Sequence, residues 1–344
     1  MMAGGPVLSM QSLSRRFGDV VAVDAVTLDI AEGEFFTIVG PSGSGKSTLV
    51  RILAGLEQPS SGEVRLRNEN ITDVPANGRP TCMVFQSLAL FSHMTIGENI
   101  EFAAKMKGVE KGARREQALE QMDIVRLPRG YYDRKVTQCS GGERQRVALA
   151  RALAAGPEIL FFDEPLSAMD YRLRKTLEVE MKDLHRRTGK TFIYITHSLE
   201  EAMVMSDRIA IMRDGRIVQA GMPAEIYGQP NSRFVAEFMG EVNLFRVESG
   251  RIAALGAEAT GVDDGFLVVR PEHLRKLDRG GSADVRFEAR LDNDYMLGSR
   301  TQFHLSVGDE VLIAELPAKS AAALEVGELG SWGFDLSNSA HVTE

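Results

Sequence analysis

Apolar runs alternate with helical repeats of apolar residues along the first part of the chain. Short runs at 35–39, 159–162 and 191–195 contain few polar residues, which is typical of buried strands. Between them, apolar residues recur at helical spacing: Leu49, Ile52, Leu53 and Leu56, then Ala118, Leu119, Met122 and Val125, and then Val147, Ala150 and Leu153. This alternation predicts an α/β domain.

The pattern changes beyond residue 243. Polar and apolar residues alternate there in short segments, at 284–292, 301–307 and 309–316, which Gly, Asp and Ser separate. Period-two alternation indicates strands with one buried face, so the sequence predicts a small all-β barrel of roughly 100 residues. A hairpin with its turn at Asp214-Gly215 is predicted shortly before it.

Composition limits the function classes. A chain of 344 residues with 44% hydrophobic content fits a soluble protein of two domains, and a net charge of −8 argues against nucleic acid as the main partner. Cys82 and Cys139 stand far apart, which indicates neither disulfides nor a metal site and suits the cytoplasm. No apolar stretch approaches the length of a membrane span and no secretory signal is seen, so any membrane spans must come from partners.

A phosphate-binding loop follows the first apolar run. The stretch from Gly40 to Ser47, GPSGSGKS, fits the pattern G-x-x-x-x-G-K-[ST]. Glycines allow backbone N–H groups to turn around phosphate oxygens, and the following helix adds its positive N-terminal end. Lys46 then reaches the terminal phosphates and the Ser47 hydroxyl coordinates Mg²⁺, so the sequence predicts nucleotide binding.

Two adjacent carboxylates, Asp163 and Glu164, end the apolar run at 159–162. Such a pair alone is most often a solvated turn. Here a Ser-Gly-Gly turn at Ser140 precedes a predicted helix just upstream, and His197 follows the run at 191–195. A bare Ser-Gly-Gly is also common as a helix N-cap or a flexible loop, so the order of these elements is the informative observation.

This succession resembles the ATPase subunit of ABC transporters over about the first 240 residues. The resemblance implies an α/β P-loop NTPase with a RecA-like core, a helical subdomain at about 87–155 and an antiparallel β subdomain, followed by an all-β, oligonucleotide-binding-fold-like (OB-like) barrel. The implied domains are residues 1–240, the ATPase, and 241–344, a regulatory barrel.

The resemblance also assigns roles to individual residues. Those expected to bind ATP are Phe17, Gly40, Pro41, Ser42, Gly43, Ser44, Gly45, Lys46, Ser47 and Thr48; Phe17 would stack on adenine, the alternative being a core phenylalanine. The expected Mg²⁺ ligands are Ser47, Gln86 and Asp163. The expected catalytic residues are Lys46, Gln86, Glu164 as general base and His197 as the switch. The signature and D-loop residues expected to contact ATP held by the opposite subunit are Ser140, Gly141, Gly142, Glu143 and Asp170.

Adjacent acids on an extended backbone point in opposite directions. This arrangement suits one carboxylate that holds the metal and one that polarises the attacking water. The signature departs from the commonest family pattern, with Cys139 for Leu and Glu143 for Gln, and Met169 replaces the usual Leu of the D-loop. Glu143 would place a negative charge near a triphosphate.

The C-terminal segments VVRPEHL and DYMLGSRTQFHL resemble the barrel behind the ATPase domain of sugar, iron and polyamine importers. The closest resemblance is to the spermidine/putrescine type. It implies a peripheral ATPase on the cytoplasmic face of the plasma membrane, with a second, identical ATPase subunit, two permease subunits and an extracytoplasmic solute-binding protein. Ferric iron, sugar and opine-like cargoes remain alternatives.

Hypotheses of other classes remain beside the importer. Tandem ATPase domains or a long basic or coiled-coil insert would favour a soluble ABC ATPase acting on nucleic acid or ribosomes, and neither is seen in the sequence. A regulatory binding module that hydrolyses little ATP is supported only by Glu143.

Overall fold

The computed structural model describes residues 5–167, 169–278, 281–321 and 324–343. By internal contacts the chain divides into two compact units, Met1–Pro223 and Ala224–Glu344. The predicted boundary falls later, after residue 240, and where the ATPase domain ends stays a prediction.

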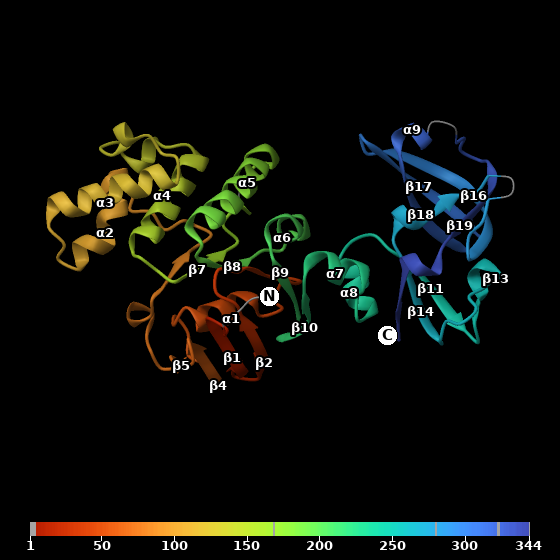
Figure 1. The fold of residues 1–344 in the computed structure, drawn as a ribbon, viewed down its shortest axis with the longest axis horizontal. Coiled ribbons are helices and arrows are strands. Elements are labelled where there is room, and N and C mark those ends of the chain that lie inside the picture. The colour runs from red at the N-terminus through yellow and green to blue at the C-terminus, as the bar shows by residue number, and fades with distance from the viewer. Residues whose placement is uncertain (1–4, 168, 279–280, 322–323, 344) are drawn as a thin grey trace. The chain divides into compact units, whose positions relative to one another are not determined.

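A mostly parallel sheet forms the centre of the first unit (Figure 1). Its strands, in spatial order, are β10 (Arg216–Gly221), β9 (Arg208–Arg213), β3 (Phe35–Val39), β8 (Thr191–Ile195), β7 (Ile159–Asp163) and β6 (Thr81–Val84). The strands β3 and β8 are buried along their whole length, as expected for a sheet that is covered on both faces. The predicted hairpin is confirmed, since β9 and β10 pair around Asp214 and Gly215.

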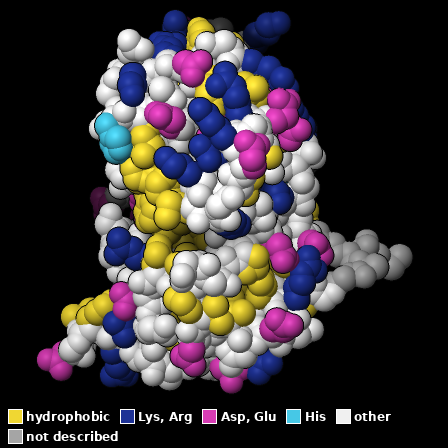
Figure 2. Space-filling view, turned by 90° about the vertical axis from the view of Figure 1, so that its left-hand side faces the viewer, with side chains coloured by type: hydrophobic (Ala, Val, Ile, Leu, Met, Phe, Trp, Pro, Cys, Tyr) yellow, Lys and Arg dark blue, Asp and Glu magenta, His cyan; other side chains and the backbone are white. Residues whose placement is uncertain are grey.

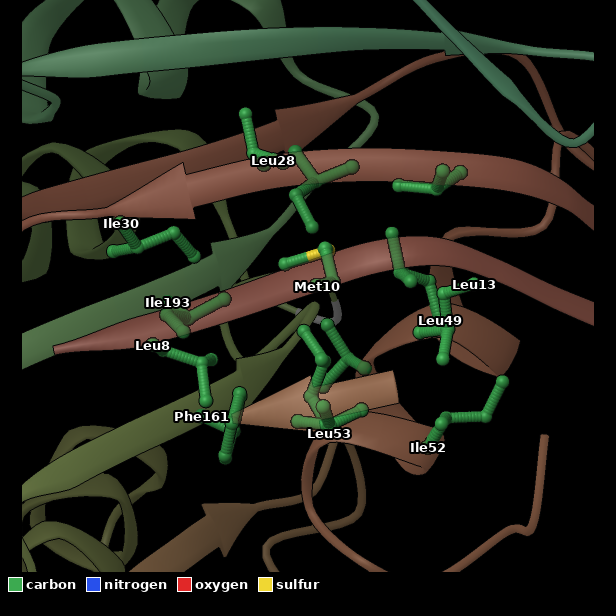
Figure 3. Packing of buried hydrophobic residues seen from close by; sticks show 14 of the residues in the cluster. Leu8, Met10, Leu13, Leu28, Ile30, Leu49, Ile52, Leu53, Phe161 and Ile193 are labelled. Atoms are coloured by element: carbon green, nitrogen blue, oxygen red, sulfur yellow. The ribbon is translucent and has the colours of Figure 1, made fainter. Parts of the chain in front are cut away.

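An antiparallel sheet covers one face of this unit. Its spatial order is β2 (Val20–Ile30), β1 (Leu8–Phe17), β4 (Ser61–Leu66) and β5 (Glu69–Asn70). Helix α1 (Lys46–Leu53) packs between this sheet and the central one. Figure 3 shows Leu49 of α1 beside Leu13 and Leu53 of α1 near Phe161, and all four belong to one buried cluster. Gly55 adopts a left-handed conformation just after the helix, so Leu56, expected to continue the apolar stripe, lies outside it and is exposed.

The helices that follow α1 in this unit are α2 (Ile96–Met106), α3 (Lys111–Ile124), α4 (Gly141–Ala154), α5 (Tyr171–Thr188) and α6 (Leu199–Met205). The predicted apolar repeats at 118–125 and 147–153 fall on two of them, α3 and α4. Helices α2, α3 and α4 pack on one another and form the helical region at the left of Figure 1. A second apolar core joins this region to the central strands, because Met122 and Val147 belong to the same buried cluster as Phe162.

The second unit is built from α7 (Pro223–Gly228), α8 (Arg233–Phe238), α9 (Ala318–Ala321) and antiparallel sheets. One sheet has the order β13 (Ala257–Glu258), β12 (Arg251–Ile252), β11 (Asn243–Glu248), β14 (Gly265–Val269) and β20 (Ser339–Val342). Another has the order β15 (Arg275–Lys276), β19 (Leu329–Phe334), β16 (Val285–Met296), β17 (Arg300–Val307) and β18 (Glu310–Pro317). Phe245, Phe303 and Trp332 lie in one shared core, and the predicted small β domain is confirmed.

A buried arginine stabilises the second unit. The guanidinium of Arg270 donates hydrogen bonds to the backbone carbonyls of Tyr227, Ala236, Gly240 and Glu241 at 2.9–3.4 Å. It also lies 4.1 Å from the centre of the Tyr227 ring. Only 3% of Arg270 is exposed, so its role here is to satisfy carbonyls that end α7 and α8.

We predict that Arg270→Met destabilises this unit by about 2–4 kcal/mol, because buried carbonyls lose their donors. Trp332 is the only tryptophan of the chain and is buried in this unit, so its fluorescence during urea unfolding reports the change selectively. Arg246→Met, at an exposed position of the same unit, is the control. Equal unfolding midpoints for the two variants would contradict the assigned role.

Candidate active site

The phosphate-binding loop connects β3 to α1 and requires glycine at two positions. Gly40 and Gly45 have φ angles of 158° and 101°. A Cβ atom on Gly45 would lie 2.0 Å from the carbonyl oxygen of Ala22, and one on Gly40 would lie 2.1 Å from that of Met212. Only glycine fits at these two positions. The first hydrogen bond of α1 joins the Leu49 N–H to the Gly45 carbonyl, which leaves the preceding N–H groups of the loop without helical acceptors.

Lys46 lies folded back into this loop. Its ammonium donates to the carbonyls of Gly40 and Pro41 at 2.8 and 2.9 Å, and lies 3.4 Å from the Ser44 hydroxyl. Burial lowers the pKa of Lys46, although the nearby Glu164 and Asp163 carboxylates act in the opposite direction. A buried cation held only by neutral oxygens favours the approach of an anion.

The two acids at the end of β7 have separate surroundings. Asp163 accepts a hydrogen bond from the Ser47 hydroxyl at 3.2 Å, and burial raises the pKa of Asp163. Glu164 has a φ of 45°, a left-handed conformation that is unusual for a residue other than glycine. Its N–H donates to the Ile195 carbonyl at 3.0 Å, so the end of β8 holds this turn in place.

Glu164 contacts His197 directly and is linked to Gln86 through Ser167. The Nδ1 atom of His197 lies 3.1 Å from Oε2 of Glu164. The Ser167 hydroxyl donates to the Glu164 carbonyl at 3.0 Å and accepts from the Gln86 amide at 2.9 Å. The structure thus joins three predicted catalytic residues, while Gln86 makes no hydrogen bond to Ser47 or Asp163 in the described part of the chain.

The signature residues begin α4. Ser140 is its N-cap and forms a reciprocal capping box with Glu143. Asp170 caps α5 by accepting from the Leu173 N–H at 3.0 Å, and Ala168 of the predicted D-loop lies outside the described residues. Among the described residues no hydrogen bond joins 140–143 to the phosphate-binding loop.

Phe17 ends β1 and is 46% exposed, so the alternative of a core phenylalanine is wrong. The Arg15 guanidinium lies 4.5 Å from the centre of its ring. Adenine stacking by Phe17 stays a prediction.

Comparisons with known proteins agree on one family. The family model described as "ABC transporter" matches residues 23–167, and the model described as "TOBE domain" matches residues 267–335. The spermidine/putrescine import ATP-binding protein PotA 2 of Pseudomonas aeruginosa is 42% identical, over 96% of this chain and 97% of its own. The spermidine/putrescine import ATP-binding protein PotA of Bacillus cereus is 40% identical, over 94% of this chain and 94% of its own. The chain belongs to the family of ABC transporter ATP-binding proteins.

Solved structures of ABC cassettes share the fold. The dimeric bacterial ABC transporter cassette MJ0796 is 33% identical and aligns with a TM-score of 0.56 over 63% of this chain and 98% of its own. The cassette MJ1267 in its ADP conformation has a TM-score of 0.60 at 26% identity, over 69% of this chain and all of its own. The predicted family and the P-loop ABC ATPase fold with a β domain behind it are therefore confirmed.

A buried network that was not expected from the sequence lies behind His197. Glu201 is 3% exposed and accepts hydrogen bonds from the hydroxyls of Tyr194 and Thr196 at 2.9 and 2.8 Å. The Thr196 hydroxyl in turn accepts from the Ser198 N–H. Arg174 of α5 donates to the Met169 carbonyl and lies 3.9 Å from Glu201. Glu201 shares the buried face of α6 with Ala202 and Met205. The spacing of those two apolar residues indicates the face, but nothing in the sequence marks Glu201 as a buried acid on it.

We predict that Glu201→Ala lowers kcat about tenfold with a smaller change in KM, because the segment that carries His197 loses its buried anchor. Steady-state ATP hydrolysis measures both constants, and Glu201→Gln should recover part of kcat. Glu200→Ala, a change at the neighbouring exposed position, is the control. If Glu201→Ala lost no more activity than Glu200→Ala, the result would contradict this role.

A second prediction concerns pH. Because burial raises the pKa of Asp163 above its ordinary value of 3.8, the unfolded chain releases this proton more readily, and ionisation at neutral pH favours unfolding. Asp163→Asn should therefore raise the melting temperature of the ligand-free protein at neutral pH by about 2 °C. The gain should vanish as the pH falls below 3.8.

Calorimetry across pH measures this effect, and Asp73→Asn at an exposed position is the control. A lower melting temperature for Asp163→Asn at neutral pH would show that the carboxylate stabilises the fold.

Proposed function

We propose that the chain is the ATP-hydrolysing subunit of an ABC importer that takes up polyamines such as spermidine and putrescine. The observation that supports hydrolysis best is the convergence of Lys46, Asp163, Glu164 and His197 at one edge of the central sheet. The names of its relatives support the coupling to polyamine import.

Mg²⁺ fits the residues present. The Ser47 hydroxyl and the Asp163 carboxylate already lie within hydrogen-bonding distance of each other, and both are hard oxygen ligands. Mg²⁺ usually takes one or two protein carboxylates and completes its shell with water and phosphate oxygens. Bound there, Mg²⁺ would neutralise charge on the β- and γ-phosphates, and Gln86 is the third proposed ligand.

Glu164 is the proposed general base. Its carboxylate accepts the proton of the attacking water, while His197 at 3.1 Å fixes the direction of that carboxylate. Lys46 exchanges the loop carbonyls for phosphate oxygens and stabilises the charge that develops on them. Positioning of this kind accounts for most of the catalysis in phosphoryl transfer.

The signature residues belong to a second copy in this proposal. The N-terminus of α4 provides backbone donors and a positive helix end, which suits the γ-phosphate of ATP bound by the partner. The solved neighbour MJ0796 is dimeric, also when bound to ADP and Pi. ATP then closes the dimer and hydrolysis releases it.

The helical region provides the proposed contact with two permease subunits. Leu88, Leu90, Phe91 and Met94 follow Gln86 and are only partly buried. Figure 2 looks onto the left-hand side of Figure 1, where the helical region lies. It shows hydrophobic side chains grouped on that side, with Lys and Arg side chains gathered above them. Such a patch is typical of protein interfaces.

An arginine connects this patch to α4. Arg151 donates to the carbonyls of Leu88 and Ala89 at 2.8 and 2.7 Å. Movement at the patch would thereby reach the helix that begins with the signature.

No helix of the described residues is long and apolar enough to span a membrane. We place the protein at the cytoplasmic face of the membrane, beneath permeases that receive cargo from an extracytoplasmic solute-binding protein. Ferric iron, sugars and opine-like solutes are the alternative cargoes, because the ATPase itself does not touch the cargo in this arrangement.

We predict that Glu164→Gln abolishes uptake of labelled putrescine and spermidine, since the variant retains ATP binding but lacks the base. Uptake is measured in cells in which the gene is deleted and then complemented with wild type or variant. Wild type should restore uptake, whereas Glu164→Gln should lower it at least a hundredfold.

The control is Glu200→Gln, an exposed change that should restore uptake fully. Uptake by the Glu164→Gln strain equal to wild type would refute the assignment of the base. Unchanged polyamine uptake in the deletion strain, with other importers absent, would instead refute the cargo.

A further inference from the structure

Glu143 uses both carboxylate oxygens in the structure. Its Oε2 accepts from the Ser140 N–H at 2.7 Å, while its own N–H donates to the Ser140 hydroxyl at 3.3 Å. The Ser140 N–H lowers the pKa of Glu143, so this side chain is ionised at neutral pH. The charge stabilises the N-terminus of α4, but it also opposes the approach of a triphosphate to the same helix end.

Arg134 contacts the other carboxylate oxygen. Its Nη1 atom lies 3.2 Å from Oε1 of Glu143, and both side chains are about three-quarters shielded from solvent, with exposures of 29% and 26%. The same guanidinium donates to the Gln138 carbonyl and lies 4.8 Å from the centre of the Tyr131 ring. These contacts restrict the guanidinium to the side of the signature turn.

The basic residues that adjoin Glu143 and Arg134 in the sequence, Arg144 and Lys135, bind backbone carbonyls and not the Glu143 carboxylate. Arg144 donates to the carbonyls of Val136 and Thr137, both at 3.3 Å, and Lys135 donates to the carbonyl of His93 at 2.8 Å. Within the described part of the chain, Arg134 is thus the cation that pairs with the Glu143 carboxylate.

We propose that Arg134 is a positioning residue of the ATP site, which neutralises Glu143 and orients the signature turn toward the γ-phosphate bound by the second copy. This inference rests on the proposed function, because it requires the ATP-bound dimer. Glu143, which stands where the family usually has glutamine, then acts as a pair with Arg134. Removing Arg134 alone exposes the partner's triphosphate to an uncompensated carboxylate, whereas removing both charges does not.

The test is a double-mutant cycle in the full-length Glu164→Gln protein, which binds ATP without hydrolysing it. Sedimentation velocity gives the ATP concentration at which half of the protein is dimeric. Arg134→Gln should raise this concentration about tenfold when Glu143 is present, but less than about twofold when Glu143→Gln is also present. The effect of Arg134→Gln should also shrink at high salt, because screening weakens the repulsion.

Arg129→Gln is the matched control. It removes an identical charge from an exposed ion pair with Asp123 in the same helical region and should leave dimerisation unchanged. Melting temperatures of the monomers identify any variant that fails to fold.

Three results would overturn the inference: normal dimerisation of Arg134→Gln, an equal loss with and without Glu143, or a loss that is independent of salt. The absence of any ATP-dependent dimer in the Glu164→Gln parent would refute the proposed dimeric site itself, and the inference with it.

Discussion

The parallel pairing of β7 with β8 is the interaction on which the candidate active site depends. In this register Asp163 lies opposite Ile195, and the next residue, Glu164, turns into a left-handed conformation while its N–H donates to the Ile195 carbonyl. His197 stands two residues after Ile195 and contacts the Glu164 carboxylate. Because β8 also pairs with β3, the same strand aligns these groups with the phosphate-binding loop.

This arrangement creates an unfavourable electrostatic environment for Asp163 and Lys46 in the free protein. Burial raises the pKa of Asp163 and lowers that of Lys46, so both charged forms are destabilised. The hydrogen-bond partners of Lys46 among the described residues are all neutral oxygens. A ligand that brings phosphate oxygens and a divalent cation relieves both costs at once, which couples the stability of the site to nucleotide binding.

The parts of the site that are local in sequence were predictable from it. The glycine spacing of the phosphate-binding loop requires positive φ angles at Gly40 and Gly45, and the acid pair directly follows a buried strand. The roles of Glu201 and Arg134 were not predictable, because each depends on partners that only folding brings into place. Glu201 resembles any acid on a short helix until its burial is known, and the charge of Glu143 looks unfavourable until Arg134 is placed beside it.

The central claim is tested most directly by ATP turnover of the protein reconstituted in proteoliposomes with the two permease subunits proposed as its partners. The comparison is between solute-binding protein loaded with spermidine and the same binding protein without cargo. Coupled import predicts several-fold faster hydrolysis with the loaded protein, because cargo shifts the permeases toward the state in which the ATPase dimer closes. Equal turnover with and without cargo, or with and without permeases, would contradict it.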